Sequence, residues 1–381
     1  MKVLLLDAAF SAIPIYEYLV DAGHDVFVMG NRPHDVLARK AGSRWIDQDY
    51  SKPDEVRPHL ARHGIESVVP GCTDISIETC AKLGLDSYPL DSFENNAILG
   101  DKAAFRRLCS ELDLPAPRVV DDNCFPAAGR FICKPVDSFS GRGVTIFDGM
   151  DVDALKEARR AAVEASPSAT ALVETFASGG LYSCSAFIEN QKLVESFYVL
   201  EGSSANPYAV DTSYVVDDVP AACRAKLSEG LERLCGALSL RDGLLHTQFI
   251  LADGGDPYII EIARRCPGDL YSLLIEYSTG FRYAAKYASY FLNAHETARI
   301  KARRYVLRHT VTSADKYEIF AGLRMTGASA VRAFFPLGAV GHELLPNQRS
   351  RAGVLFCEAS DYDQLIADYD RFIARDAYQV G

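Results

Sequence analysis

Three short segments of this chain carry residue types suited to phosphate and metal chemistry. In the first, an apolar strand ends in Lys134 and is followed by the Ser/Gly-rich run 138–143. Backbone N–H groups of such a loop can surround phosphate oxygens, and a lysine adds a positive charge beside them. A plain β-hairpin with a lysine on its surface is the ordinary alternative. The residues that this segment offers to a phosphate chain are Lys134, Ser138, Ser140, Gly141 and Gly143.

The second segment, 171–176, is an apolar strand that enters the small-residue turn 178–180. If its backbone forms an exposed sheet edge, that edge can pair with the polar edge of a purine base. Phe176 would then supply an apolar wall for the base. A core strand without any ligand is the alternative interpretation, and this segment alone favours the core strand.

The third segment is a hairpin of strands 244–251 and 258–262, joined by a turn that contains Gly254-Gly255. Glu261 lies at the end of the second strand and is expected to face Gln248 across the hairpin. Their oxygens could hold Mg²⁺ while phosphate oxygens complete the octahedron. Arg265 could hold a phosphate or carboxylate in its planar fork. The ordinary alternative is a surface Glu–Arg pair of little energetic value.

The elements that must position these segments follow from the apolar pattern. The first ~95 residues alternate β-α-β-α-β, which predicts a parallel sheet with helices on its faces. The expected strands are 3–6, 26–29 and 67–70, and the expected helices are 14–22 and 53–63. A dinucleotide site would need Gly-x-Gly-x-x-Gly after the first strand, but the chain has Asp7 to Ala12 there without glycine, which disfavours an NAD oxidoreductase.

Beyond this unit, Asp101 is expected to cap a helix that runs to Leu112 and ends before Pro115. From there to about residue 200 the pattern predicts mostly strands and turns. Helical periodicity then predicts three helices, at 220–238, 270–292 and 362–373. His246, two residues before Gln248 on the same strand face, could reach the site, but a structural role is the favoured interpretation, and the same two alternatives apply to His309.

Composition excludes several classes of function. The formal net charge of −11 argues against a nucleic-acid partner, and no apolar run approaches the ~20 residues that a membrane span needs. The N-terminus is a poor signal peptide because acidic Asp7 follows a short apolar run. The ten cysteines include no Cys-x-x-Cys pair, so they are expected to be reduced thiols in a cytoplasmic protein.

Taken together, the order and spacing of these segments resemble the ATP-grasp superfamily of carboxylate–amine and carboxylate–thiol ligases, over nearly the whole chain. In that family a lysine opens a helix after the N-terminal domain, as Lys102 does here. The resemblance implies that Lys102 and Lys134 contact ATP phosphates. It implies further roles for residues of the other two segments: an adenine-binding hinge of Glu174, Thr175 and Phe176, Mg²⁺ or Mn²⁺ ligands Gln248 and Glu261, and catalytic action by Arg265 and Lys134.

The resemblance also implies an α/β fold, α+β in parts, with three regions. Residues 1–97 would form a Rossmann-like N-terminal domain. Residues 98–294 would form the ATP-grasp domain, with a lid lobe at about 117–176. Residues 295–381 would form a C-terminal lobe that completes the core.

Three positions depart from the family pattern. Leu181 stands where a ribose-binding glutamate is common, Gln248 replaces the first metal carboxylate, and Ala263 replaces an asparagine. Ala263 fits the string Glu-x-Ala-x-Arg-x-x-Gly, which is similar to that of L-amino-acid ligases. The amide of Gln248 can still offer a neutral oxygen to a metal, but one negative charge is lost.

The resemblance implies an ATP-dependent ligase that activates a small-molecule carboxylate as an acyl phosphate and couples it to an amine, releasing ADP and phosphate. Two alternatives stay open at this point. One is a nucleotide-binding protein without ligase activity, and the other is a bicarbonate-using carboxylase of the biotin or purine type. A homodimer is expected from the resemblance only.

Overall fold

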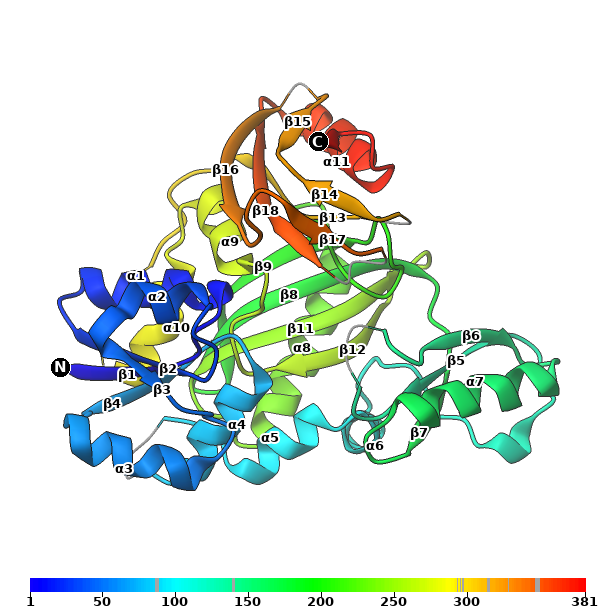
Figure 1. Ribbon diagram of the computed structural model, residues 1–381. Helices are drawn as coiled ribbons and strands as arrows, with labels where there is room; N and C mark the ends of the chain where they lie inside the picture. The colour runs from blue at the N-terminus through cyan, green and yellow to red at the C-terminus, as the bar shows by residue number, and fades with distance from the viewer. Residues whose placement is uncertain are drawn as a thin grey trace.

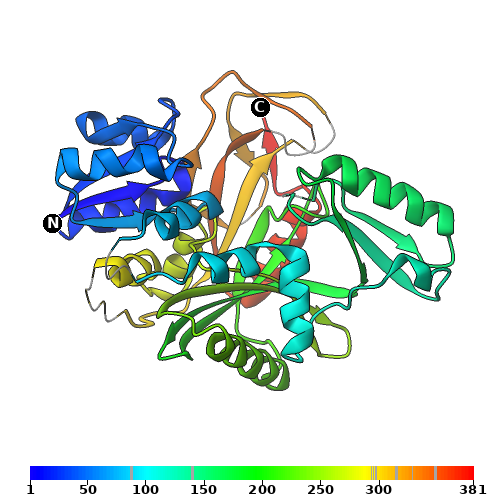
Figure 2. The ribbon, with the colours of Figure 1, turned by 90° about the horizontal axis from the view of Figure 1, so that it is seen from below.

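The computed structural model describes residues 1–381 except 86–88, 139–140, 293, 295, 297, 314–315, 328 and 347–349. The polypeptide forms three lobes around one large central sheet (Figure 1). The N-terminal lobe lies on one side of this sheet and a small lobe lies on the opposite side. The C-terminal segment rises between them, and the view from below shows the same separation (Figure 2).

The N-terminal lobe is a parallel sheet of order β3-β2-β1-β4. Its strands are β1 (Lys2–Leu6), β2 (Asp25–Gly30), β3 (Trp45–Asp47) and β4 (Ser67–Pro70). Residues Val3 to Leu6 of β1 are all fully buried, because helices cover both faces of the sheet. These helices are α1 (Ile13–Asp21), α2 (Val36–Ala41), α3 (Pro53–His63) and α4 (Asp74–Leu83). The predicted parallel sheet is confirmed, although β3, α2 and α4 were not predicted.

The connection from this lobe contains α5 (Phe93–Gly100) and α6 (Lys102–Glu111). The predicted cap of α6 is confirmed, since Asp101 Oδ1 accepts the N–H of Ala104 at 2.7 Å.

The small lobe, called the lid below, has a sheet of order β6-β5-β7. It comprises β5 (Arg130–Pro135), β6 (Thr145–Asp148) and β7 (Ala171–Thr175), with α7 (Val152–Ala165) packed on one face. The prediction of mostly strands here was wrong for α7. Its buried stripe of Leu155, Ala158 and Ala162 has helical spacing, and Asp151 caps its first turn.

The central sheet has the order β12-β11-β8-β9-β10-β13-β18-β16. Its strands are β8 (Gly179–Glu189), β9 (Lys192–Gly202), β10 (Thr212–Val216), β11 (Gly243–Ala252), β12 (Pro257–Ala263), β13 (Tyr305–Thr312), β16 (Ala330–Pro336) and β18 (Arg351–Ala359). The predicted hairpin of β11 and β12 is confirmed. The predicted division at residues 97/98 and 294/295 stays a prediction.

The two faces of the central sheet differ in character. On one face, side chains such as Cys184, Ala186 and Leu245 pack against α6, α8 (Ala221–Ala237) and α11 (Tyr362–Ile373). On the other face, Phe187 and Leu244 pack against α9 (Tyr271–Thr279) and α10 (Tyr283–Ser289), together with the N-terminal lobe. Because side chains alternate along a strand, the second face also carries Ser183, Glu201, Gln248, Glu261 and Arg308.

The predicted helix 270–292 is divided in two. It ends at Gly280, whose φ of 69° lies in the left-handed region, and α10 and the 3-10 turn η4 (Tyr290–Leu292) follow. The single-helix prediction was therefore wrong, because apolar periodicity continues through the break.

Nine of the ten cysteines are buried as free thiols and Cys124 is exposed. In the part of the chain that the structure describes, no helix combines the length and the apolar character needed to cross a bilayer.

Candidate active site

Lys102 and Lys134 meet at the lid. Lys102, the first residue of α6, donates its Nζ hydrogens to the carbonyl oxygens of Ser138 at 3.0 Å and Val136 at 3.4 Å. These carbonyls lead directly from β5 into the Ser/Gly loop. Lys134 is the penultimate residue of β5. Ser140 lies outside the described residues.

A buried triad of charges holds Lys134. Its Nζ lies 2.6 Å from Glu174 Oε2, and Arg106 Nε donates to Glu174 Oε1 at 2.7 Å. The side chains are 8% (Lys134) and 1% (Arg106 and Glu174) exposed. Burial lowers the pKa of the Lys134 ammonium, and the carboxylate of Glu174 opposes that shift. Arg106 and Lys134 share the one carboxylate of Glu174, and the charge of Lys102 also acts on Lys134, so the region has excess positive charge that favours an anionic ligand.

Arg106 also reaches the central sheet. Its NH2 group donates to the carbonyl oxygen of Ile260 at 2.8 Å. Ile260 directly precedes Glu261 on β12. The triad of the lid is therefore hydrogen-bonded to the strand that carries the predicted metal ligand.

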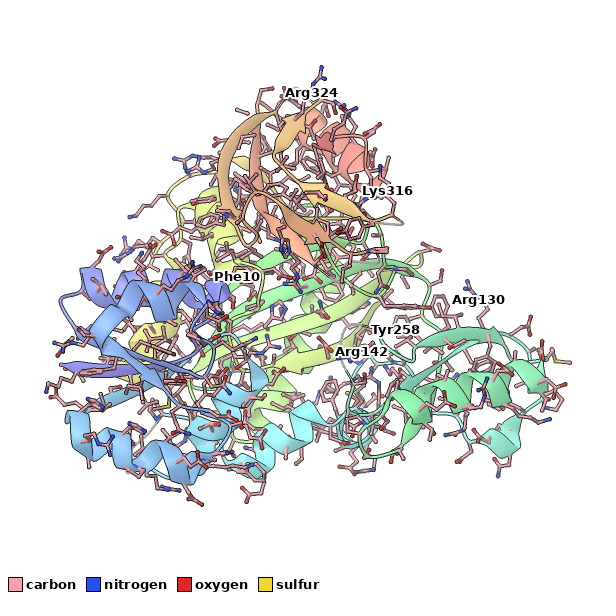
Figure 3. All side chains as sticks on the ribbon, viewed as in Figure 1. Phe10, Arg130, Arg142, Tyr258, Lys316 and Arg324 are labelled. Atoms are coloured by element: carbon pink, nitrogen blue, oxygen red, sulfur yellow. The ribbon has the colours of Figure 1, made fainter. Side chains whose placement is uncertain are left out.

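The Ser/Gly loop is fixed at two glycines. A Cβ on Gly141 (φ 68°) would lie 2.1 Å from the Cβ of Tyr208, and one on Gly143 (φ 72°) would lie 2.6 Å from the Cβ of Ala165. Only glycine fits both the close contacts and the left-handed backbone. The loop therefore touches the connection between β9 and β10. Figure 3 places Arg142 where the lid meets the central sheet, and Arg130 further out on the lid.

The predicted adenine-binding hinge, Glu174 to Phe176, lies at the end of β7 and directly after it. The backbone edge at 174–176 is occupied, as the core-strand interpretation expects: the N–H of Thr175 donates to the carbonyl oxygen of Arg118 at 2.9 Å, and that of Phe176 donates to the carbonyl oxygen of Arg130 at 3.0 Å. The segment after Pro117 lies alongside β7 and takes its edge. The carboxylate of Glu174 is likewise engaged in the triad. Base contacts by Glu174, Thr175 and Phe176 stay a prediction, and these bonds leave little of the backbone for it.

The predicted metal ligands are cross-strand neighbours. Gln248 and Glu261 pair directly in the register of β11 and β12. The amide nitrogen of Gln248 donates to Glu201 Oε2 at 2.5 Å. Burial raises the pKa of the Glu201 carboxyl to about 7. Glu261 is exposed and makes no ion pair with the residues that the structure describes.

Gln248 and Glu261 could hold one Mg²⁺ ion, for which the protein would supply only a few of the ligands. Within the described ranges, no group of three or more His, Cys, Asp or Glu side chains could form a metal cage. Mg²⁺ usually takes one or two carboxylates and fills its octahedron with water and substrate phosphate. The Gln248 amide donates its nitrogen to Glu201, so its oxygen is the atom that a metal would use, on the residue paired with Glu261 in the register. An ion held mainly by phosphate fits this pair.

Arg265 is held by a carboxylate from the N-terminal lobe. Its Nε lies 2.7 Å from Asp74 Oδ1 and its NH2 lies 3.0 Å from Asp74 Oδ2, a two-point contact. Asp74, at the start of α4, was not predicted. Burial acts to lower the pKa of the Arg265 guanidinium, but the Asp74 carboxylate outweighs it and raises that pKa above its usual value, so Arg265 stays charged.

The two histidines are structural, as predicted. His246 is buried against Ser185 and the ring of Tyr271. Burial lowers its pKa to about 3, so it stays neutral. His309 Nδ1 contacts Thr212 Oγ1 at 2.8 Å and its Nε2 contacts the hydroxyl of Tyr378 at 2.9 Å.

Neither a protein-family model nor a curated protein sequence matches this chain. Solved structures do match it. A phosphoribosylglycinamide synthetase from Anaerococcus prevotii superposes with a TM-score of 0.78 at 17% identity, over 100% of this chain and 99% of that one. An L-amino acid ligase from Bacillus licheniformis gives a TM-score of 0.79 at 16% identity, over 100% and 98% of the two chains.

An N5-carboxyaminoimidazole synthetase from Staphylococcus aureus, complexed with ADP, gives a TM-score of 0.74 at 10% identity, over 98% of this chain and 96% of that one. The chain has the ATP-grasp fold. Within this ATP-grasp fold, the lid triad, the Ser/Gly loop and the Gln248–Glu261 pair lie around the junction between lid and central sheet.

Three residues of the site were missed from the sequence. Arg106 lies one helical turn after Lys102, so the i, i+4 spacing was a usable signal. Glu201 is an isolated acid near the end of the apolar strand β9. Asp74 gave no signal, since its partner is far away in the chain.

Proposed function

We propose that the chain is an ATP-dependent ligase that activates a carboxylate as an acyl phosphate and joins it to an amine. One observation supports this most strongly. A continuous path of polar contacts runs from Lys134 through Glu174 and Arg106 to the backbone next to Glu261. It links the cations of the lid to the strand that carries Glu261, which supports a site for phosphoryl transfer between them.

In the proposed reaction, an oxygen of the substrate carboxylate attacks the γ-phosphorus of ATP and the bond to the β-phosphate oxygen breaks. ADP leaves, and the carboxylate becomes an acyl phosphate. The nitrogen of an amine then attacks the acyl carbon, the bond to phosphate breaks, and the nitrogen loses a proton. The products are an amide, ADP and phosphate. Catalysis consists mainly of positioning and neutralising charge.

The chain's residues divide this work. Lys102, Lys134 and the loop 138–143 would hold the phosphate chain, and Arg265 would neutralise the carboxylate and its acyl phosphate. Gln248 and Glu261 would hold Mg²⁺, which when bound neutralises phosphate charge. The Ser/Gly loop, which packs on Tyr208, would exclude the water that hydrolyses acyl phosphates. All three of the matching structures described above are named as a ligase or a synthetase, and one of them is complexed with ADP, which supports the proposal.

Phosphate release from MgATP tests the proposal. We expect release only when a carboxylate and an amine are both present, and we expect hydroxylamine to trap the acyl phosphate as a hydroxamate. Lys134→Ala and Glu261→Ala should abolish release. Release that depends on bicarbonate alone would favour a carboxylase, and ATP binding without release under any substrate mixture would overturn the ligase proposal.

A further inference from the structure

The Asp74 carboxylate is presented by a rigid loop of the N-terminal lobe. Asp7 at the end of β1 accepts the backbone N–H groups of Ala9 and Cys72, both at 2.9 Å. A Cβ on Gly71 would lie 2.1 Å from that of Asp7, so the two strand ends are in contact. Thr73 then caps α4, in which Asp74 is the first residue. Asp74 is therefore held in position by backbone bonds rather than by its ion pair alone.

Arg265 stands on an equally fixed loop. Asp269 and Leu270, which follow it, both have φ of 58°, a left-handed conformation that is costly for side chains with a Cβ. Arg308 donates to the carbonyl oxygen of Asp269 at 3.3 Å, and Arg351 donates to its carboxylate at 2.8 Å. Such a strained backbone persists only where surrounding contacts hold it in place, so the turn after Arg265 is rigid.

The neighbouring arginine serves as an internal reference. Arg264 Nε lies 2.6 Å from Asp91 Oδ2, and the two side chains are 6% and 1% exposed. In contrast, the side chains of Arg265 and Asp74 are 21% and 56% exposed. The buried Arg264–Asp91 pair already ties β12 to the segment before α5. Because Asp74 is more than half exposed, water can replace its partner, and the Arg265–Asp74 pair can open at a lower cost than the buried Arg264–Asp91 pair.

The Arg265–Asp74 pair also lies where the N-terminal lobe meets the central sheet. Arg265 follows Glu261 on the same strand end, and Asp74 belongs to the carboxyl edge of the N-terminal sheet, where α/β folds bind ligands. Phe10, from the same edge, lies at the boundary between the N-terminal lobe and the central sheet (Figure 3). A ligand entering between the lobes would therefore meet a guanidinium and a carboxylate side by side.

We propose that the Arg265–Asp74 pair opens to bind the zwitterion of an α-amino acid as the carboxylate substrate, with its carboxylate in the fork of Arg265 and its ammonium on Asp74. This inference rests on the proposed ligase function and names its substrate class. One protein ion pair is exchanged for two ion pairs with the ligand, so neither charge is left unpaired. A carboxylate without an ammonium would leave Asp74 unpaired, which gives the site its selectivity.

The experiment compares amino acids with their des-amino analogues. Hydroxamate formation from MgATP and hydroxylamine is measured for L-alanine against propanoate, L-valine against isovalerate, and L-phenylalanine against hydrocinnamate. We expect wild-type kcat/KM to favour the best amino acid by about 10- to 100-fold, the range of a charged hydrogen bond. Asp74→Asn should remove this preference mainly by lowering kcat/KM for the amino acid, and Asp74→Glu should retain part of it.

The control is Asp25→Asn, which removes an accessible Asp–Arg pair (2.7 Å, to Arg44) elsewhere in the N-terminal lobe and should leave the preference unchanged. Equal loss for both substrate types in Asp74→Asn, with a lowered Tm, would mean an interdomain latch and overturn the inference. Wild-type hydroxamate from des-amino acids as readily as from amino acids would overturn it while leaving the ligase proposal intact. Absence of hydroxamate from every acid would overturn both.

Discussion

The lid triad and the Arg265–Asp74 pair use the same chemical groups in opposite settings. In the triad, Glu174 is 1% exposed and is bonded to two cations at once. In the pair, Asp74 is 56% exposed and binds one cation. Buried charge must be matched wherever it occurs, because desolvation costs several kcal/mol per ion. Exposed charge can change partners cheaply, since water replaces what is lost.

Because of this difference in burial, Glu174 is expected to keep its partner during the reaction and Asp74 is expected to change its partner. Glu174 is expected to stay with Arg106 when ATP arrives, while Lys134 is partly released toward phosphate. Asp74 is expected to exchange its partner with each substrate. The comparison predicts that substitutions in the triad act on folding, whereas substitutions at the exposed acids act on turnover alone.

The largest expected effect comes from Glu174→Gln. It leaves Arg106 and Lys134 buried without a carboxylate, so the free energy of unfolding should fall by about 3–5 kcal/mol. Urea unfolding followed by circular dichroism measures this. A loss under about 1 kcal/mol would show that water reaches the triad and would break the comparison.

Glu261→Gln should cost catalysis but not stability. The side chain of Glu261 is exposed, so the substitution should not disturb the fold. It removes the one carboxylate of the Gln248–Glu261 pair, so kcat should fall at least about 100-fold, or ~2.7 kcal/mol. The Tm without nucleotide should not change. Retained turnover in Glu261→Gln would argue that no metal is held at this hairpin.

His309 offers an intermediate case, a buried ionisable group kept neutral rather than paired. Burial holds its pKa well below the ordinary value, and Arg375 and Arg308 lower it further. The unfolded chain therefore binds one more proton below pH ~6.5, and stability should decline by about 1.4 kcal/mol per pH unit as the pH falls through that range. Urea midpoints measured from pH 7.5 downward, in wild type and His309→Gln, should show a shallower acid slope in the variant.

The smallest effect belongs to Asp153→Asn, a matched control on the lid. Asp153 pairs with Lys156 at 2.7 Å, close to the Glu174–Lys134 distance, but its side chain is 90% exposed. We expect no measurable change in Tm or in phosphate release. A drop like that of Glu174→Gln would mean that burial is not what distinguishes the two acids.

Much of the fold could be predicted from the sequence because local patterns encode it. The buried run Val3 to Leu6 and the hairpin around Gly254 both follow rules that depend on neighbours in the chain. The helix α11 likewise has the predicted bounds, Tyr362–Ile373. The break at Gly280 was missed because apolar periodicity runs through it.

The site was predictable only in part. Residue types and spacing predicted the Gln248–Glu261 pairing, which is confirmed as a cross-strand contact. The closed edge of β7 and the Asp74 partner of Arg265 depend on segments distant in the chain. Local pattern carries no information about such contacts, so the segment that pairs with β7 was not predicted and Asp74 was missed.

The order of strands in the central sheet bears on how this chain is made. Strand β10 pairs with β13, and the residues between them include both β11 and β12. A nascent chain on the ribosome therefore cannot pair the strands of this sheet in the order in which they are synthesised. The edge of β10 that pairs with β13 stays unpaired until β13 has emerged. During that interval the unpaired edge of β10 is open to pairing with the strands of other chains.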